Sequence, residues 1–332
     1  MDPRLRSSHR AEALVAIVGP TGSGKSDLAV ELSRALGGEI VGCDALQVYR
    51  GFDVGTAKLP QQARREVPHH LLDVASPSDE FSAARYVSIA TECILQIRNR
   101  GNLPIVVGGT GLYLRALRYG LFEGPSREPT LRARLWGIER RRRGKLHRML
   151  ARWDPPSAAR IHPNDSVRLV RALEVYLSSG RPMSSMMTER RAPLSGFRDI
   201  LVGLRPGRAV LARRISERVE SMYAGGLAEE VRGLVARHGM ALPAFKAIGY
   251  RECLAAMAGR IDWDRAQSLT EKATIQYAKR QLTWFRKETG VTWFDGVGDE
   301  PSVRSNVLWH LRRELSRDTL PGMEKDDAET AS

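Results

Sequence analysis

The sequence predicts an α/β protein: a P-loop NTPase-like parallel sheet core with a helical insertion domain and C-terminal helices. The first observation is a stretch that fits the phosphate-binding pattern G-x-x-x-x-G-K-[ST], namely Gly19-Pro20-Thr21-Gly22-Ser23-Gly24-Lys25-Ser26. The second is its setting, because an apolar run of strand length (residues 14–18) precedes it and apolar residues at helical spacing (residues 27–36) follow it. The third is a repeated alternation of strand-like and helix-like segments, which is typical of parallel sheets.

The phosphate loop predicts the kind of ligand that binds. Its glycines let backbone N–H groups curl around an anion, the start of the next helix adds partial positive charge, and Lys25 adds a full charge. Ser26 is the residue placed to hold Mg²⁺. The motif therefore predicts a ligand with two or more phosphates. It fits ATP as well as other diphosphates, and it does not by itself predict hydrolysis.

The length of 332 residues allows two domains, or one domain with a large insertion. Residues 1–123 are predicted as the P-loop core and residues 124–195 as a helical insertion, where Pro, Arg and Ser become frequent. Residues 196–317 are predicted as the rest of the core with the C-terminal helices, and the acidic residues 318–332 as a disordered tail. We expect a monomer.

Composition restricts the cellular setting. No apolar run approaches the ~20 residues of a membrane span, so no membrane partner is expected. The basic residues 1–10 lack the apolar segment of a secretory signal, which leaves a short organellar presequence as an alternative. The three cysteines are far apart and form no CxxC pair, which argues against disulfides or a zinc site and predicts a cytoplasmic protein.

The net charge of +14 and the pI near 10.2 favour a polyanionic partner such as nucleic acid. The alternative is a surface that uses arginine for solubility. A run of arginines at residues 140–143, in a segment predicted as one helix over residues 129–150, fits either a solvated helix face or a nucleic-acid clamp. Arg168 and Arg171 are three residues apart in a further predicted helix and so share a face.

A second strand, residues 39–42, ends at Cys43-Asp44. Functional groups collect at the carboxyl ends of parallel strands, so Asp44 is expected near Lys25 and Ser26. It is a candidate metal ligand or general base, and a helix N-cap is the structural alternative. A polar loop with several glycines follows up to residue 58, and its composition is more typical of an active site than of a structural connection.

The next predicted strands are residues 70–74 and 103–107, separated by a helix over residues 82–98. An ordinary P-loop NTPase ends a later strand in an Asp that helps to hold Mg²⁺. Here the strand runs instead into Gly108-Gly109-Thr110 and a helix over residues 112–117. This weakens the NTPase interpretation, leaves Asp73 or Asp44 as substitutes, and makes Thr110 a candidate to face the diphosphate.

The C-terminal half returns to the same alternation. A strand is predicted at residues 199–204. Helices are predicted at residues 210–223, 227–238 and 263–288, and a Gly-containing junction at residues 245–251 leads into another helix that ends near residue 259. The aromatic residues Trp284, Phe285, Trp293 and Phe294 are interpreted as core rather than as base-stacking platforms.

Several further motifs occur in a fixed order between residues 14 and 295. After the phosphate loop come residues 44–51 with Asp53, 55–58, 68–73, 108–113, 161–165, Arg168 with 171–175, 248–251 and 278–284. Together they resemble the tRNA dimethylallyltransferase family, also called tRNA isopentenyltransferases. One departure is Ala45, where the family usually has Ser after the Asp. The carboxylate remains, so the departure puts one hydrogen bond in doubt rather than the activity.

The resemblance implies transfer of a dimethylallyl group from dimethylallyl diphosphate to the exocyclic amine of the adenine immediately 3′ of the anticodon in tRNA. The products are N6-(dimethylallyl)adenosine and diphosphate. The P-loop and Mg²⁺ would stabilise the leaving group, and Asp44 would be the general base. By the same resemblance, Thr110 and Arg218 lie at the diphosphate or the reacting centre.

The resemblance also implies that residues 124–195 clamp the anticodon stem-loop and that the target adenine leaves its stack to enter the pocket. The residues that it places on the tRNA are Asp44, Ala45, Leu46, Gln47, Thr110, Arg132, Val167, Arg168, Leu169, Val170, Arg171, Lys246, Ala247, Ile248, Gly249, Tyr250 and Arg251.

Three alternatives remain at this point. An adenylate isopentenyltransferase would use a free nucleotide, but such an acceptor needs no long basic insertion. A small-molecule kinase would turn over ATP, and the missing strand-end Asp counts against it. A non-catalytic RNA-binding protein with a relict loop is disfavoured because Lys25, Ser26, Asp44 and Thr110 are all intact.

Overall fold

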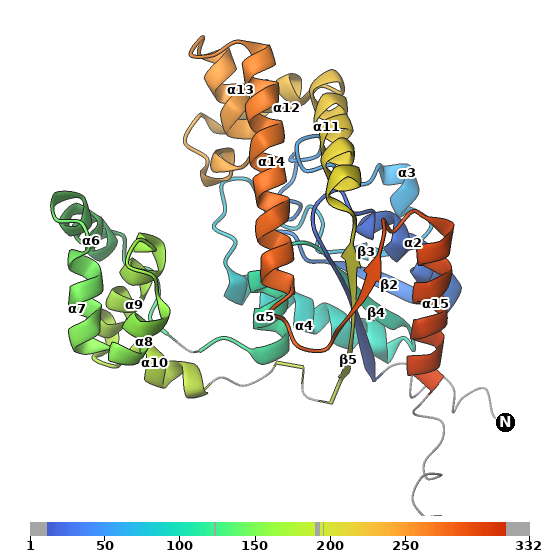
Figure 1. Cartoon of the computed structure of the whole chain (residues 1–332), viewed down its shortest axis with the longest axis horizontal. Coiled ribbons are helices and arrows are strands. Elements are labelled where there is room, and N and C mark those ends of the chain that lie inside the picture. Colours follow the sequence, from blue (N-terminus) through green and yellow to red (C-terminus); the bar gives the residue numbers. More distant parts are fainter. Residues whose placement is uncertain (1–11, 123, 190–192, 195, 317–332) are drawn as a thin grey trace, which may run out of the picture. The chain divides into compact units, whose positions relative to one another are not determined.

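A six-stranded parallel sheet forms the core, with the strand order β3-β2-β4-β1-β5-β6 (Figure 1). The strands are β1 Ala13–Val18, β2 Gly38–Gly42, β3 His69–His70, β4 Leu103–Val107, β5 Arg198–Arg205 and β6 Val291–Asp295. All six residues of β1 are buried, as expected for a central strand that is covered on both faces. The prediction of a parallel α/β sheet of the P-loop NTPase kind is confirmed.

This computed structural model describes residues 12–122, 124–189, 193–194 and 196–316. The chain divides into two compact units, of which the first comprises Met1–Leu114 with Leu194–Ser332 and the second Arg115–Pro193. The second unit overlaps the insertion predicted at residues 124–195. The basic N-terminus and the predicted acidic tail lie outside the described residues.

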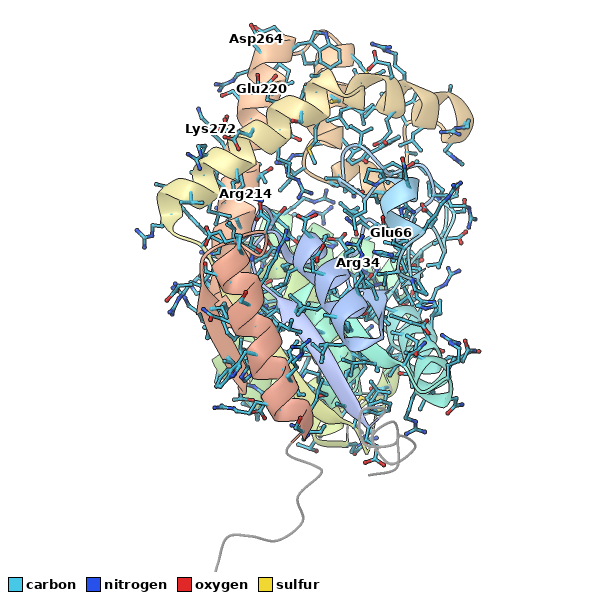
Figure 2. The ribbon with its side chains drawn as sticks, turned by 90° about the vertical axis from the view of Figure 1, so that its right-hand side faces the viewer. Arg34, Glu66, Arg214, Glu220, Asp264 and Lys272 are labelled. Atoms are coloured by element: carbon cyan, nitrogen blue, oxygen red, sulfur yellow. The ribbon has the colours of Figure 1, made fainter. Side chains whose placement is uncertain are left out.

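Helices α2 Lys25–Leu36 and α15 Pro301–Ser316 cover one face of the sheet. Their apolar residues share a buried cluster with alternate residues of β1, β4 and β5, which is the period-2 pattern of one sheet face. Helix α4 Ala83–Asn99 packs against β2 and β4. Arg34 of α2 forms an ion pair with Glu66 of the segment after helix α3 Gln61–Arg64 (Figure 2).

The predicted strand at residues 70–74 is wrong beyond its first residue. Leu71 and Asp73 have φ values of 61° and 57°, in the left-handed region, so the strand ends at His70. The Asp73 carboxylate bonds to the Lys58 ammonium at 2.6 Å and to the Arg64 guanidinium at 3.0 Å. These contacts pair the Asp73 carboxylate with two cations.

The single helix predicted over residues 129–150 is also wrong. The structure has α6 Pro129–Arg141 and α7 Lys145–Trp153, separated by a turn in which Gly144 has a φ of 74°. The buried Glu139 carboxylate accepts the N–H groups of Gly144 and Leu146, which caps the start of α7. The break lets the two helices bury separate faces in one small core.

The second unit has its own apolar cluster. Its remaining helices are α8 Pro155–Arg160, α9 Ser166–Ser179, α10 Met183–Met186 and the short 3₁₀ helix η1 Met187–Glu189. The boundary between the units falls within helix α5 Gly111–Tyr119.

The C-terminal helices agree with their predicted positions. They are α11 Arg208–Ala224, α12 Leu227–His238, α13 Tyr250–Met257 and α14 Trp263–Phe285, with a 3₁₀ helix η2 Pro243–Lys246 before α13. Helices α11 and α14 pack together through a shared apolar cluster. Phe285 is buried, as the core interpretation of the aromatics requires, whereas Trp284, Trp293 and Phe294 are half-buried.

Strand β6 and helix α15 were not predicted. Strand β6 lies at the edge of the sheet, where it pairs with β5, and its residues are half-buried or exposed, so it lacks a buried-strand pattern. Among the described residues, no helix is both long and apolar enough to cross a membrane. The three cysteines are free thiols.

Candidate active site at the phosphate loop

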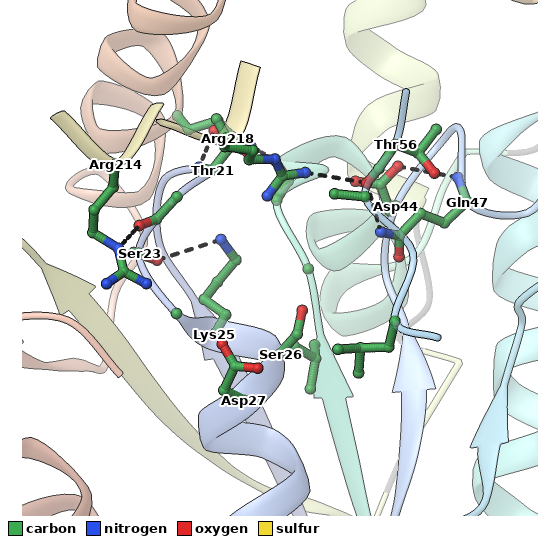
Figure 3. A pocket seen from close by; sticks show the side chains of 18 of the residues that line it. Thr21, Ser23, Lys25, Ser26, Asp27, Asp44, Gln47, Thr56, Arg214 and Arg218 are labelled. Atoms are coloured by element: carbon green, nitrogen blue, oxygen red, sulfur yellow. Dashed lines mark hydrogen bonds between the residues drawn. The ribbon is translucent and has the colours of Figure 1, made fainter. Parts of the chain in front are cut away.

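A cavity of about 410 Å³ lies at the carboxyl ends of β1, β2 and β4 (Figure 3). The P-loop follows β1, Asp44 follows β2, and Gly108 and Gly109 follow β4, so adjacent parallel strands bring these segments together. The remaining wall comes from the loop at residues 47–59 and from helices α11 and α14.

The P-loop has the expected anion-binding shape. Helix α2 begins at Lys25, so its N-terminus and its partial positive charge face the cavity. Gly24 has a φ of 76°, and a Cβ there would lie 2.7 Å from the Asp299 carboxylate. Both the backbone angle and the close approach therefore require glycine. Ser26 is exposed at the cavity.

The Lys25 ammonium is held within the loop, where it donates to the Pro20 carbonyl at 2.6 Å and to the Ser23 hydroxyl at 3.5 Å. Burial lowers the pKa of Lys25 to about 7, the charge of Arg218 acts in the same direction, and Asp44 opposes both. An anion in the cavity would favour the protonated form.

Helix α11 contributes two arginines to the cavity. Arg218 donates to the Thr56 carbonyl at 3.1 Å, and burial lowers its pKa although Asp44 and Asp27 act in the opposite direction. Arg214 donates to the Gly22 carbonyl at 3.0 Å and to the Asp299 carboxylate at 2.9 Å. The sequence interpretation assigned no role to Arg214. Its spacing of four residues from Arg218, which puts both on one helix face, was the available signal.

Asp44 uses one carboxylate oxygen to hold the chain that follows it and lines the cavity. Its Oδ1 accepts the N–H groups of Leu46 at 2.9 Å and of Gln47 at 3.3 Å, which caps the following turn. Within the described part of the chain, Oδ2 accepts no hydrogen bond. One carboxylate oxygen thus orients the side chain, and the other is available to a ligand.

Thr110 lies just beyond the cavity-lining residues Gly108 and Gly109. Its hydroxyl accepts the Ala45 N–H at 3.0 Å, which fixes the start of the loop after β2. A Cβ on Gly108 would lie 2.0 Å from the Cys43 carbonyl oxygen. This contact explains why β4 is followed by glycine rather than by the Asp of ordinary NTPases.

Residues of helices α11, α12 and α13 hold the loop that follows Asp44. The side-chain amide of Gln47 donates to the Thr56 carbonyl at 3.1 Å, the same oxygen that Arg218 bonds. Glu230 of α12 accepts three backbone N–H groups, from residues 53, 54 and 55, and also the Tyr250 hydroxyl at 2.6 Å. Tyr250 is fully buried and packs against Gly55, so its side chain supports the loop.

The residues predicted to contact tRNA differ in accessibility. In the first unit, Lys246 and Arg251 are exposed, while Gly249 is buried and Ala247 and Ile248 are half-buried. In the second unit, Val167 and Arg168 are exposed, whereas Leu169 and Val170 are buried in its core. Arg132 and Arg171 both bond to the buried Glu174 carboxylate, at 2.9 Å and 2.8 Å.

The described residues contain no group of three or more His, Cys, Asp or Glu side chains that would hold a metal by themselves. Mg²⁺ commonly keeps several waters and binds through one or two protein oxygens together with substrate phosphates. The Ser26 hydroxyl and the Asp44 carboxylate both line the cavity and fit that second arrangement. These two oxygens could therefore hold an ion only together with oxygens of a phosphorylated ligand.

The fold and the cavity define the class: an α/β protein of the P-loop NTPase-like kind with a cationic site for a phosphorylated ligand. The family model described as IPP transferase matches residues 47–288, and the one described as isopentenyl transferase matches residues 12–68. The chain belongs to the IPP transferase family and is a transferase. The resemblance inferred from the sequence motifs is thereby confirmed.

Two relatives show how far the similarity extends. The chain is 47% identical over 306 residues to a tRNA dimethylallyltransferase of Solibacter usitatus, covering 92% of this chain and 99% of the relative. It is 49% identical over 296 residues to the tRNA dimethylallyltransferase of Anaeromyxobacter dehalogenans, covering 89% of this chain and 98% of the relative.

Solved structures agree with these relatives. The tRNA isopentenylpyrophosphate transferase of Bacillus halodurans is 37% identical with a TM-score of 0.69, and the match covers 93% of this chain and 98% of that one. A eukaryotic dimethylallyltransferase acting on tRNA is 26% identical with a TM-score of 0.74, covering 93% of this chain and 79% of that one.

Proposed function

We propose that this protein transfers the dimethylallyl group of dimethylallyl diphosphate to the exocyclic amine of the adenine immediately 3′ of the anticodon in tRNA. The observation that carries the proposal is one cavity with the Lys25 and Arg218 cations and the Asp44 carboxylate in its wall. Relatives named tRNA dimethylallyltransferase and a solved enzyme acting on tRNA support it. The protein acts as a cytoplasmic monomer in this proposal.

The first part of the chemistry is departure of diphosphate. As the allylic C–O bond breaks, negative charge grows on the leaving oxygens, and Lys25, Arg218 and the N–H groups at the start of α2 stabilise it. The partly buried setting makes these interactions stronger than they are in water. Mg²⁺, held by Ser26 and the diphosphate, would supply additional Lewis-acid stabilisation.

The second part is attack by adenine. The lone pair of the exocyclic amine is delocalised into the ring, so the amine needs a base as its new C–N bond forms. Asp44 Oδ2 takes the proton, while Oδ1 stays bonded to Leu46 and Gln47 and keeps the carboxylate in place. The balance is one C–N bond formed, one C–O bond broken, a proton on Asp44 and diphosphate released. Thr110 supports this geometry by fixing the loop that carries Asp44.

Binding of the tRNA uses exposed charge. In this proposal Lys246, Arg251, Arg168 and the arginines at 140–143 contact phosphates, which position the RNA without reading its sequence. The second unit clamps the anticodon stem-loop, and the adenine flips into the pocket, where Gln47 lies beside Asp44. Buried members of the predicted set, such as Tyr250 and Leu169, act by holding these neighbours in place.

The test is incorporation of labelled dimethylallyl diphosphate, with Mg²⁺, into unmodified tRNA that carries adenine 3′ of the anticodon, with AMP as a parallel acceptor. Label in tRNA and not in AMP is the expected outcome. Label in AMP alone would make the protein a nucleotide prenyltransferase. No label with ATP consumed would instead favour a P-loop kinase.

A further inference from the structure

We propose that Gln281 is a positioning residue that holds the two backbone walls of the diphosphate cavity, the P-loop and the Gly108–Gly109 turn, at a fixed separation. This inference rests on the proposed function only in taking diphosphate as the ligand. Gln281 lies in the motif at residues 278–284, which the proposed chemistry leaves without a role.

The contacts of Gln281 are specific. Its Oε1 accepts the Thr21 N–H at 2.8 Å, and its Nε2 donates to the Gly109 carbonyl at 3.0 Å. Gln281 is 6% exposed; its hydrogen bond to Gly109 is buried, and its hydrogen bond to Thr21 is partly buried at the cavity. One side chain from α14 thus bridges a loop that follows β1 and a turn that follows β4.

An amide is needed at this position. Thr21 presents a donor and Gly109 an acceptor, and a glutamine side chain has both complementary groups. Glutamate would place a carboxylate oxygen against the Gly109 carbonyl, and methionine would leave both backbone groups without their partner. We therefore expect that a residue of similar size and shape without both a donor and an acceptor cannot replace Gln281.

Gly109 is matched to this side chain. A Cβ on Gly109 would lie 2.1 Å from the Gln281 Nε2 atom, so a larger residue there would force the Gln281 amide out of its present position. The φ of Gly109 is outside the left-handed region, so backbone conformation alone would tolerate alanine. The contact between Gly109 and Gln281 thus links the motif at residues 108–113 to the motif at residues 278–284.

Helix α14, which carries Gln281, is held in place by buried residues. Ala278 and Phe285, on either side of Gln281, are buried, and Ala278 packs against α11. Tyr277, one turn before Gln281, lines the same cavity. Because reaction rates fall steeply when reacting groups shift by about 1 Å, a change in the separation of the two walls affects both donor binding and turnover.

The first experiment measures binding of inorganic diphosphate with Mg²⁺ by calorimetry to the full-length protein. Gln281→Met and Gln281→Glu should each bind about tenfold more weakly or worse, the size expected for losing a buried hydrogen-bonded pair. Gln276→Met is the matched control, because Gln276 is exposed on the same helix, and it should bind like the unsubstituted protein. With tRNA and donor, the Gln281 variants should raise the KM for donor and lower kcat, with the KM for tRNA unchanged.

The second experiment uses Gly109. Gly109→Ala should weaken diphosphate binding when Gln281 is present, and it should cost far less in a Gln281→Ala background, where the clash is gone. Additive effects, or a Gln281→Met variant that binds diphosphate normally, would overturn the inference. If the unsubstituted protein binds no diphosphate at all, the proposed function fails instead, and the two outcomes are distinguishable.

Discussion

Arginine is used differently in the two units. In the cavity of the first unit, Arg214 and Arg218 are tied to backbone carbonyls, and burial lowers the pKa of Arg218. In the second unit, Arg132 and Arg171 bond to Glu174, whereas Arg168 and the arginines at 140–143 are exposed. The arginines therefore differ in their burial and in their partners, although the residue type is the same.

The largest expected effect tests the cavity. Asp44→Ala should lower turnover by about 10²–10⁴-fold, the range for loss of a positioned base, with tRNA affinity retained. Asp44→Asn separates the two roles of the residue, because its amide oxygen still caps the turn but the second position cannot take a proton. Single-turnover rates should fall similarly in both variants. A normal rate in Asp44→Asn would leave Asp44 only its capping role.

The next effect concerns the pH dependence of diphosphate binding. The pKa of Lys25 is about 7 in the free protein, so binding above that pH requires proton uptake by Lys25. Affinity should weaken as pH rises through 7, by up to about tenfold per pH unit. Calorimetry in buffers of different ionisation enthalpy measures the uptake. Lys25→Ala should bind diphosphate more weakly than the unsubstituted protein already at pH 6. Its remaining pH dependence measures the titration of diphosphate itself and is the baseline. If the affinities of the variant and of the unsubstituted protein changed with pH in the same way, this role for Lys25 would be contradicted.

A third prediction concerns the buried carboxylate of the second unit. Glu174→Gln should destabilise the protein by about 1–3 kcal/mol, because two arginines lose their charged acceptor. Glu189→Gln is the control, since its ion pair with Arg181 is exposed and contributes about 0–1 kcal/mol. Thermal unfolding compares the two variants, and equal shifts would remove the special role of Glu174.

The same carboxylate predicts an acid limit to stability. Burial acts to raise the pKa of Glu174, but the hydrogen bond from Arg171, together with the Glu128 N–H and Arg132, leaves it below its ordinary value of 4.5. The stabilisation is therefore complete above that ordinary value and is lost as pH falls through the lower folded-state pKa. In Glu174→Gln this part of the acid unfolding profile should disappear.

The smallest effect separates the two kinds of arginine within the second unit. Arg168→Ala should weaken tRNA binding a few-fold and reduce the salt slope of log affinity by about 0.7–0.9, as expected for one phosphate contact. Arg171→Ala should act mainly on stability, because Arg171 bonds to Glu174 and to the Pro125 carbonyl. Filter binding at several salt concentrations, beside thermal unfolding, tests the pair. A slope change only in Arg171→Ala would reverse the assignment.

Local sequence signals predicted much of the site. The P-loop, the buried strand before it and the helix after it depend on neighbouring residues, and all three lie where the pattern places them. Asp44 was found because the end of a parallel strand is adjacent to the P-loop in this class of fold. Arg218 and the tRNA-contacting set came from family resemblance rather than from the pattern.

Tertiary packing decided the rest. Gln281 meets Thr21 across 260 positions and Gly109 across 172, and Arg214 reaches Gly22 across 192, so no local pattern relates them. The helix break at Gly144 occurs where the Glu139 carboxylate caps the next helix. The left-handed residues after His70 occur where Asp73 pairs with Lys58. In both places a side-chain contact outweighs local propensity. The anion-binding motif and the fold class follow from the sequence alone, because backbone conformation and hydrophobic period are local properties. Only the folded structure decided which arginines are buried and which backbone groups they hold, because burial depends on all the elements that pack around a residue.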